Sequence, residues 1–148
     1  MRLTTALCLM LIPVTPPLQA QEPVATLSGV AAIKDGDGVL FGDVEVRLQG
    51  VAAPERGDVM GRESYLGLIA LAEGKLVVCE LDGTTAGTKH RPVGVCFVND
   101  QDIGRAQIEA GLARDCPAFS KGRYRDAEIG AQSSGNNLSK LYDLPSYC

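Results

Sequence analysis

The first half of the chain alternates short runs of β-branched and apolar residues with glycine-rich turns, a pattern typical of strands. Residues 25–34 form a β-like run that ends in Asp-Gly-Asp-Gly, and the next two runs, 39–41 and 44–49, flank a Gly-Asp turn. In the last run apolar and polar residues alternate strictly, so that Arg47 projects from the polar face, away from the core. We therefore predict three strands in succession.

A helical period replaces this alternation between residues 61 and 73. Leu66, Ile69 and Ala70 lie on one apolar stripe, and Gly74 follows at the position that commonly ends a helix. The pattern predicts a helix over 61–73 with this stripe toward the core.

Two further β-rich runs, 75–81 and 92–98, precede two weaker helical patterns, 102–110 and 123–131. Five strands interrupted by one helix after the third, with further helices at the end, is the element order of a small closed β-barrel of the oligonucleotide-binding type. The sequence thus predicts one α+β domain, mainly β, with a five-stranded barrel and about three short helices.

The first twenty residues are typical of a secretory signal peptide. Arg2 supplies a positive start, an apolar run spans 3–12, and the segment ends in Leu-Gln-Ala. That run is shorter than the ~20 residues that a membrane-spanning helix needs. We expect cleavage after Ala20, a secreted or periplasmic protein, and a single domain over 21–148 without a membrane segment.

Cysteine usage agrees with export. Loss of Cys8 with the signal peptide leaves four cysteines, an even number that favours disulfides and allows three pairings. The fourth and fifth predicted strands can form a hairpin that places Cys79 opposite Cys96. This register favours a second bond between Cys116 and Cys148, which would pin the C-terminal tail.

Composition and charge exclude some functions. The chain contains one histidine, His90, which excludes metal sites and acid/base pairs that need several imidazoles. The formal net charge is −4, and loss of Arg2 with the signal peptide makes it −5. Such a balance argues against holding polyanions by bulk electrostatics, so that nucleic-acid binding would need local basic clusters.

Three short segments carry candidate chemistry. Asp35 and Asp37 are separated by one glycine that lets their carboxylates converge on a hard cation, although the same residues are typical of a bare β-turn. Arg47 ends a strand and Glu55 follows in a loop, where both residues are also typical of solvated surface. A basic run at 89–91 precedes another strand, as many solvated turns do.

The ordered set of these segments resembles the thermonuclease family, the staphylococcal-nuclease-like proteins. The likeness runs from Gly29 to Glu128 through the segments DGD, VRLQGVAAPE, HRPVGVC and DIGRAQIEAGLA. Members of that family have the barrel described above. They are commonly exported, calcium-dependent phosphodiesterases that act on DNA and RNA.

The resemblance implies a role for each candidate residue. Asp37 matches a direct metal ligand and Asp35 a supporting carboxylate. Glu55 matches the glutamate proposed to position or deprotonate the attacking water. Arg47 and Arg91 match the two arginines that grip the phosphate. A phosphodiester is an anion, and these residue types can neutralise its charge and assist the attack of water.

Nucleic acid is also expected to contact residues outside this catalytic set. Phe119 and Tyr124 are the aromatic side chains available for base stacking, because Pro117 stands where an aromatic residue is common. The predicted nucleic-acid-binding residues are Lys89, Phe119, Lys121 and Arg123.

The chain departs from the family pattern at the metal. Ala52 replaces an aspartate that is a metal ligand, and Gly38 replaces a threonine. The carbonyl of Ala53 can still coordinate, and Asp58 is a candidate substitute. Because calcium affinity depends on the number of charged ligands, we expect a weakened Ca²⁺ site, with other divalent metals open.

Three readings remain. The first is an exported metal-assisted nuclease, weakened or retuned, acting on DNA or RNA. The alternative is a non-catalytic binding module for an anionic ligand on the same fold, with a disulfide-stapled structural protein as a third reading. We expect a monomer without an obligate protein partner.

Overall fold

The computed structural model describes residues 23–148 except residue 137, and the predicted signal peptide, 1–20, lies outside this part of the chain. No helix among the described residues is long and apolar enough to cross a membrane. The elements are β1 Ala25–Val30, β2 Ala32–Asp35, β3 Gly38–Phe41, β4 Val44–Leu48, β5 Val51–Ala52, α1 Gly61–Ala72, β6 Leu76–Ala86, β7 Arg91–Val98, β8 Gln101–Asp102, α2 Ile103–Glu109, β9 Arg114–Asp115, α3 Pro117–Ser120, α4 Arg125–Ser133 and a 3₁₀ helix Leu138–Lys140.

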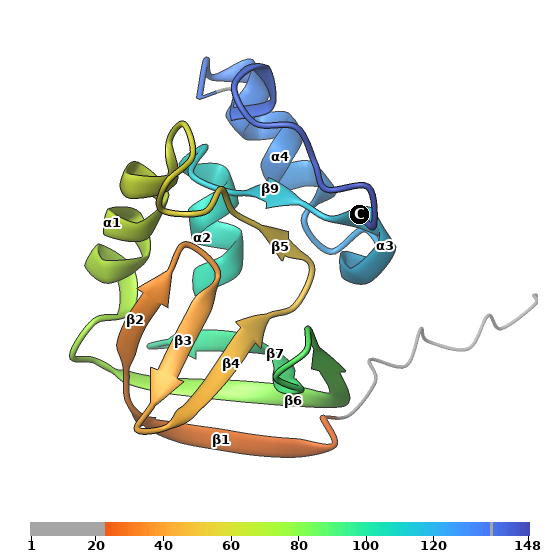
Figure 1. The fold of residues 1–148 in the computed structure, drawn as a ribbon. Helices are drawn as coiled ribbons and strands as arrows, with labels where there is room; N and C mark the ends of the chain where they lie inside the picture. Colours follow the sequence, from red (N-terminus) through yellow and green to blue (C-terminus); the bar gives the residue numbers. More distant parts are fainter. Residues whose placement is uncertain (1–22, 137) are drawn as a thin grey trace, which may run out of the picture.

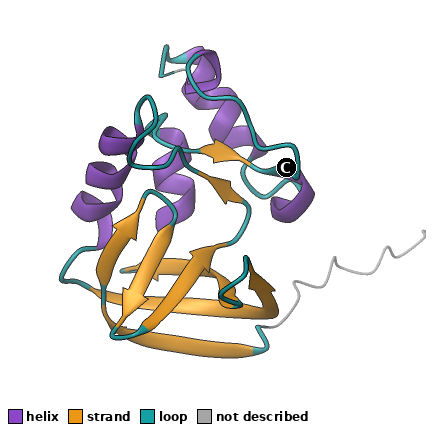
Figure 2. Ribbon diagram, viewed as in Figure 1, coloured by secondary structure: helices purple, strands orange, loops and turns teal. Residues whose placement is uncertain are grey.

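The strands form a curved sheet, and the helices gather on one side of it (Figures 1 and 2). The order is β1-β6-β7-β4-β3-β2, with β8 paired to β7 and β5 paired to β9 in a separate ribbon. All pairs are antiparallel except β4 and β7, which run parallel. The mainly β, α+β class is therefore confirmed. Within the described residues the ladder is open, because no pairing joins its outermost strands, β1 and β2.

The run predicted as one strand over 25–34 is divided at Ala31. The N–H of Ala31 donates to the carbonyl of Lys75 at 3.0 Å, and its carbonyl accepts from the N–H of Gly74 at 2.9 Å. The residue is thereby bonded to the turn after α1 instead of to a neighbouring strand. This break, together with three two-residue strands, gives more strands than the five expected.

Helix α1 forms where predicted, but of the predicted apolar stripe only Ile69 packs against the core. Leu66 is 46% exposed and Ala70 is also exposed. The buried face contains Gly61, Ser64, Leu68 and Ala72 instead. The reason is a close helix neighbour: a Cβ on Gly67 would lie 2.3 Å from a methyl of Leu112 and 2.7 Å from the side chain of Gln107. Small residues on this face let α2 approach α1.

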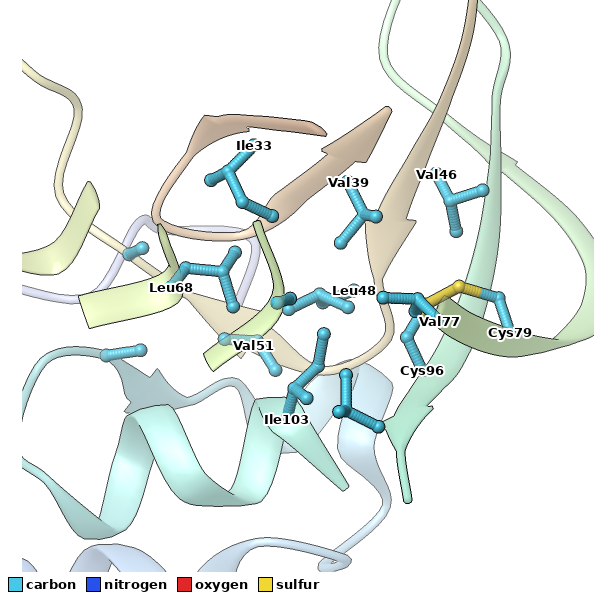
Figure 3. Packing of buried hydrophobic residues seen from close by; sticks show 14 of the residues in the cluster. Ile33, Val39, Val46, Leu48, Val51, Leu68, Val77, Cys79, Cys96 and Ile103 are labelled. Carbon is cyan, nitrogen blue, oxygen red and sulfur yellow. A yellow bond between two sulfur atoms is a disulfide. The ribbon is translucent and has the colours of Figure 1, made fainter. Parts of the chain in front are cut away.

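The core lies between the sheet and helices α1 and α2. Figure 3 shows Ile33, Val39, Leu48, Leu68 and Ile103 pointing into this interior. A fully buried side chain of this size contributes about 1.5–3 kcal/mol relative to an exposed one. The cluster therefore holds β2, β3, β4, α1 and α2 in one packed unit.

Both predicted disulfides are confirmed. Cys79 on β6 pairs in register with Cys96 on β7 and bonds to it across the hairpin. Cys116, immediately before α3, bonds to Cys148 at the C-terminus. The second bond fixes the end of the chain beside α3 (Figure 1).

The Cys79–Cys96 bond should contribute strongly to stability. We predict that Cys79→Ala combined with Cys96→Ala lowers the free energy of unfolding by about 3 kcal/mol, because the bond closes a loop of 17 residues. Urea unfolding of the variant and the wild type at equal pH measures the difference. A change below about 1 kcal/mol would contradict this role.

Candidate functional site

Five residues predicted from separate sequence segments line one cleft of about 330 Å³. They are Asp35, Asp37, Arg47, Glu55 and Arg91. The other lining residues are Ala53, Asp58, Tyr142, Asp143, Pro145 and Tyr147.

Strand pairing brings the predicted residues together. The β2–β3 turn carries the two aspartates, and the antiparallel pairing of β3 with β4 places Arg47 opposite Gly38, next to that turn. The parallel pairing of β4 with β7 then aligns Arg47 with Val93. Side chains two residues apart on a strand point to the same face, so Arg91 shares a face with Val93. Arg91 therefore lies on the same face of the sheet as Arg47.

Two glycines shape the aspartate turn. A Cβ on Gly36 would lie 2.0 Å from the hydroxyl of Ser64, so that position requires glycine if α1 is to pack there. A Cβ on Gly38 would lie 2.6 Å from Oδ1 of Asp35. Gly38 thus leaves room for the carboxylate of Asp35 beside the cleft.

Asp37 is the most buried of the cleft carboxylates, at 9% exposure. Its Oδ2 accepts from the N–H of Ala53 at 3.1 Å and forms an ion pair with Arg47. Burial raises the pKa of Asp37 to about 7; the positive charge of Arg47 opposes this shift, and the negative charge of Asp35 adds to it. The carboxyl group consequently titrates near neutral pH.

The two arginines are held by carboxylates and main-chain oxygens. Nη1 of Arg47 also donates to the carbonyl of Asp37 at 3.3 Å. Nη1 of Arg91 donates to Glu45 at 2.7 Å, and Lys34 donates to the same carboxylate at 2.6 Å. Burial lowers the pKa of Arg91, but the hydrogen bond and charge of Glu45 outweigh it and raise that pKa above its ordinary value. Sequence reasoning missed Glu45, which positions Arg91.

Glu55 lies in the exposed loop between β5 and α1. Its N–H donates to Oδ2 of Asp58 at 3.2 Å, and its carbonyl accepts from the N–H of Asp58 at 2.8 Å. A Cβ on Gly61 would lie 1.7 Å from the same carbonyl, so the start of α1 packs directly on this loop. Among the described residues no hydrogen bond or ion pair engages the Glu55 side chain, which leaves its carboxylate available to a ligand.

The C-terminal tail forms a wall of the cleft that sequence reasoning missed. The hydroxyl of Tyr142 donates to the carbonyl of Ala53 at 3.2 Å. The main-chain carbonyl of Tyr142 accepts from Nη1 of Arg114 at 3.1 Å. Burial raises the pKa of Tyr142 to about 12, and the nearby Tyr147 and Asp37 add to the shift. The predicted Cys116–Cys148 bond was the one signal that the tail returns to the body of the domain.

The predicted nucleic-acid-binding residues lie outside the lining of the cleft. Phe119 on α3 is exposed and packs edge-on against Tyr147, which does line it. Tyr124 is 1% exposed, and its hydroxyl lies 3.4 Å from Asp102, so the stacking role considered for it is wrong. Lys89, Lys121 and Arg123 are exposed side chains.

The cleft carries more negative than positive charge. Five carboxylates line it against two guanidinium groups: Asp35, Asp37, Glu55, Asp58 and Asp143 against Arg47 and Arg91. A phosphate group would be repelled by this excess unless a cation or protons offset it. The net charge of the lining therefore favours cation binding before anion binding.

The donors at the turn fit a weakly held divalent cation. Asp35, Asp37 and the carbonyl of Ala53 offer the oxygen ligands that hard cations prefer. Ala52 is 1% exposed on β5 and supplies no carboxylate. Within the described residues no group of three or more His, Cys, Asp or Glu is arranged to hold a metal.

Comparison with known proteins adds one relative. The chain is 34% identical over 131 residues to the succinoglycan biosynthesis protein ExoI of Rhizobium meliloti (strain 1021). The match covers 80% of this chain, and the chain spans 66% of that protein's length. No protein-family profile matches the chain.

The raised pKa of Asp37 predicts a pH dependence of stability. Between the ordinary value of 3.8 and about 7 the folded state binds more protons at this group than the unfolded chain does. The contribution of Asp37 to the free energy of unfolding therefore falls as the pH rises through this window. We expect the stability of the wild type relative to Asp37→Asn to fall from about pH 4 to about pH 7.

Urea unfolding across this pH range measures the difference between the two proteins. Asparagine keeps a carbonyl that can accept from Ala53 but does not titrate. Asp43→Asn, in the exposed β3–β4 turn, is the matched control and should run parallel to the wild type. If the free energies of unfolding of Asp37→Asn and the wild type differ by the same amount at every pH, the raised pKa of Asp37 is contradicted.

Proposed function

We propose that this protein is an exported phosphodiesterase that hydrolyses DNA or RNA in the cleft, with assistance from a weakly bound divalent metal. The observation that carries the proposal is the convergence of Arg47, Arg91, Glu55 and the two turn aspartates on one cleft. These residues come from the three candidate segments identified in the sequence. Surface charges scattered at random would not meet in this way.

The architecture supports the same proposal. β1 and β2 are successive segments of one run, joined through Ala31, and they form the two outer edges of the curved sheet. We propose that the fold is a variant of the five-stranded oligonucleotide-binding barrel, with this divided strand at its seam. The cleft lies at the end of the sheet where the β2–β3 turn meets β4 and β7.

The arginines would bind the non-bridging oxygens of the phosphate. Each guanidinium group has five N–H donors, and the contacts within the chain occupy Nη1 of Arg47 and Nη1 of Arg91. The other donors remain for a bidentate contact with the phosphate. As negative charge grows in the transition state, these fixed cations stabilise it without reorganisation.

Glu55 would act on the attacking water. Its carboxylate accepts a proton as the water oxygen bonds to phosphorus, while the bond from phosphorus to the leaving sugar oxygen breaks. That oxygen takes a proton from solvent. The exposed loop position lets Glu55 return its proton to bulk water between turnovers.

The metal would be held by Asp37, Asp35 and the carbonyl of Ala53. When bound it neutralises the phosphate and supplies Lewis-acid stabilisation. Burial of Asp37 disfavours its charged form, and a cation bound beside it would favour ionisation, in the same sense as Arg47 does. Tyr142 orients the carbonyl of Ala53 by donating to one of its lone pairs.

A second candidate is a non-catalytic module that binds an anionic ligand. Ala52 favours it, because it supplies no carboxylate to the proposed metal site and binding does not need the metal that hydrolysis does. The relative's name assigns that protein to succinoglycan biosynthesis and mentions no nuclease. Succinoglycan is therefore a suitable probe beside DNA and RNA.

Nuclease activity should depend on Glu55. We predict that purified protein lacking 1–20 nicks supercoiled plasmid or degrades RNA in the presence of a divalent metal. Glu55→Gln should lower kcat by about 10²- to 10⁴-fold, because it removes the proton acceptor and keeps the size. Glu63→Gln, exposed in the first turn of α1, is the matched control and should retain activity. Binding of DNA, RNA or succinoglycan without cleavage would instead favour the binding module.

Arg91 should not be replaceable by lysine. We expect Arg91→Lys to retain the ion pair with Glu45 but to lose at least about tenfold in kcat/KM, because an ammonium group cannot contact phosphate bidentately. Arg62→Lys, on the exposed face of α1, is the control. Equal activities of Arg91→Lys and the wild type would remove the guanidinium from the mechanism.

The activity should require a divalent metal, and the affinity for that metal should be low. Activity titrated with Ca²⁺, Mg²⁺ or Mn²⁺ should saturate near about 10⁻⁴ to 10⁻³ M, since few charged ligands surround the cation. Asp37→Asn should shift saturation to higher concentration. Full activity in excess chelator would overturn the metal-assisted mechanism.

A further inference from the structure

A buried amide on α2 lies against the aspartate turn. Gln107 is 0% exposed. Its Nε2 donates to the carbonyl of Gly36 at 3.1 Å and to the carbonyl of Ser64 at 2.9 Å. Gly36 lies in the β2–β3 turn between the candidate metal ligands Asp35 and Asp37, and Ser64 lies on α1. One side chain therefore joins the proposed cation site to both α1 and α2.

The core accommodates this amide at a cost to stability. Oε1 of Gln107 has no hydrogen-bond partner among the described residues. Burial of a polar atom without a partner destabilises a folded protein, so an apolar side chain of similar size would suit this position better. A glycine in the middle of α1 leaves room for the amide, because a Cβ on Gly67 would lie 2.7 Å from Oε1. Glycine inside a helix also lowers stability.

These two unfavourable choices coincide beside the proposed cation site. Sequence choices that lower stability are expected at functional sites, where the placement of a group is maintained at the expense of the fold. Helix packing alone does not require an amide, because apolar side chains also let two helices meet closely. The contact with the turn therefore accounts for Gln107 better than the packing of α1 on α2 does.

The peptide group between Gly36 and Asp37 depends on this contact. Its carbonyl accepts from Gln107, and its N–H, which belongs to Asp37, donates to Oδ1 of Asp35 at 3.3 Å. Gly36 is buried, and a buried carbonyl without a donor is unfavourable. Loss of the amide would therefore favour rotation of this peptide group toward another donor. Because the group is planar, rotation would also turn its N–H away from the carboxylate of Asp35.

We propose that Gln107 is a positioning residue for the cation site, which orients the peptide group between the two aspartates and thereby the carboxylate of Asp35. The inference rests on the proposed function, since it assumes that the turn binds a divalent cation. Gln107 does not line the cleft, so it acts only through the turn. Residues that orient metal ligands in this way commonly change the metal affinity when they are substituted.

Calcium affinity separates this role from a purely structural one. Gln107→Met keeps an unbranched side chain of similar length but removes the donor, and Gln107→Leu removes it in a second shape. Amide NMR signals of the intact oxidised protein, followed during titration with Ca²⁺, measure the dissociation constant of the folded state. We expect both variants to raise that constant at least about tenfold. Ile108→Val, also 0% exposed on α2, is the matched control. It should unfold at a lower temperature but bind Ca²⁺ as the wild type does.

Hydrogen exchange of the metal-free protein gives a second readout. In Gln107→Met the N–H of Asp37 should exchange with deuterium faster than in the wild type, because the peptide group that carries it is no longer held. The amide groups of β6 and β7, far from Gln107 in the sheet order, should exchange at the wild-type rate. In Ile108→Val the exchange at Asp37 should stay unchanged.

The outcomes distinguish the two proposals. If Gln107→Met binds Ca²⁺ and exchanges at Asp37 as the wild type does, the positioning role is overturned and the proposed function stands. The role is also overturned if Ile108→Val loses as much Ca²⁺ affinity as Gln107→Met, because stability alone would then set the affinity. If the wild type binds no divalent cation, the proposed metal-assisted function fails, and the role of Gln107 at the cation site fails with it.

Discussion

The carboxylate of Asp37 connects three segments of the chain at the cleft. It accepts from Ala53 after β5, pairs with Arg47 on β4, and belongs to the turn that joins β2 to β3. Removal of either charged partner would leave the other poorly solvated in a partly buried site, which is expensive. The pair therefore holds two candidate functional groups together, although burial disfavours the charged form of Asp37. Structure and proposed chemistry compete for the same atoms.

This competition affects the charge that a phosphate would meet in the cleft. If the arginines are held by Asp37 and Glu45, a phosphate meets a lining that is already neutralised or negative. A divalent cation at the turn would offset the negative charge of the lining. The positive charge of each guanidinium group would then act more strongly on the ligand. A carboxylate at position 52 would raise the affinity for the cation but would also add negative charge near the phosphate. The alanine there would thus act in two opposing directions on the proposed catalysis.

Much of this site could be predicted because it depends on local sequence and strand register. Alternation places Arg47 at a strand end, and the hairpin register gives the Cys79–Cys96 bond. Tertiary neighbours decide what was missed. The buried face of α1 differs from its apolar stripe because α2 packs closely at Gly67. Glu45 has no motif of its own, and its contact with Arg91 spans 46 residues of sequence.

The tail shows a further limit of local reasoning. Residues 142–147 have no regular secondary structure, and their place depends on two distant anchors, the Cys116–Cys148 bond and the contact of Tyr142 with Ala53. A disulfide is usually regarded as a source of stability. Here the Cys116–Cys148 bond also sets which tail residues line the cleft. Because the position of this cleft wall depends on one covalent bond, reduction of that bond would release the wall and leave the core, which has its own disulfide and its own packed interior.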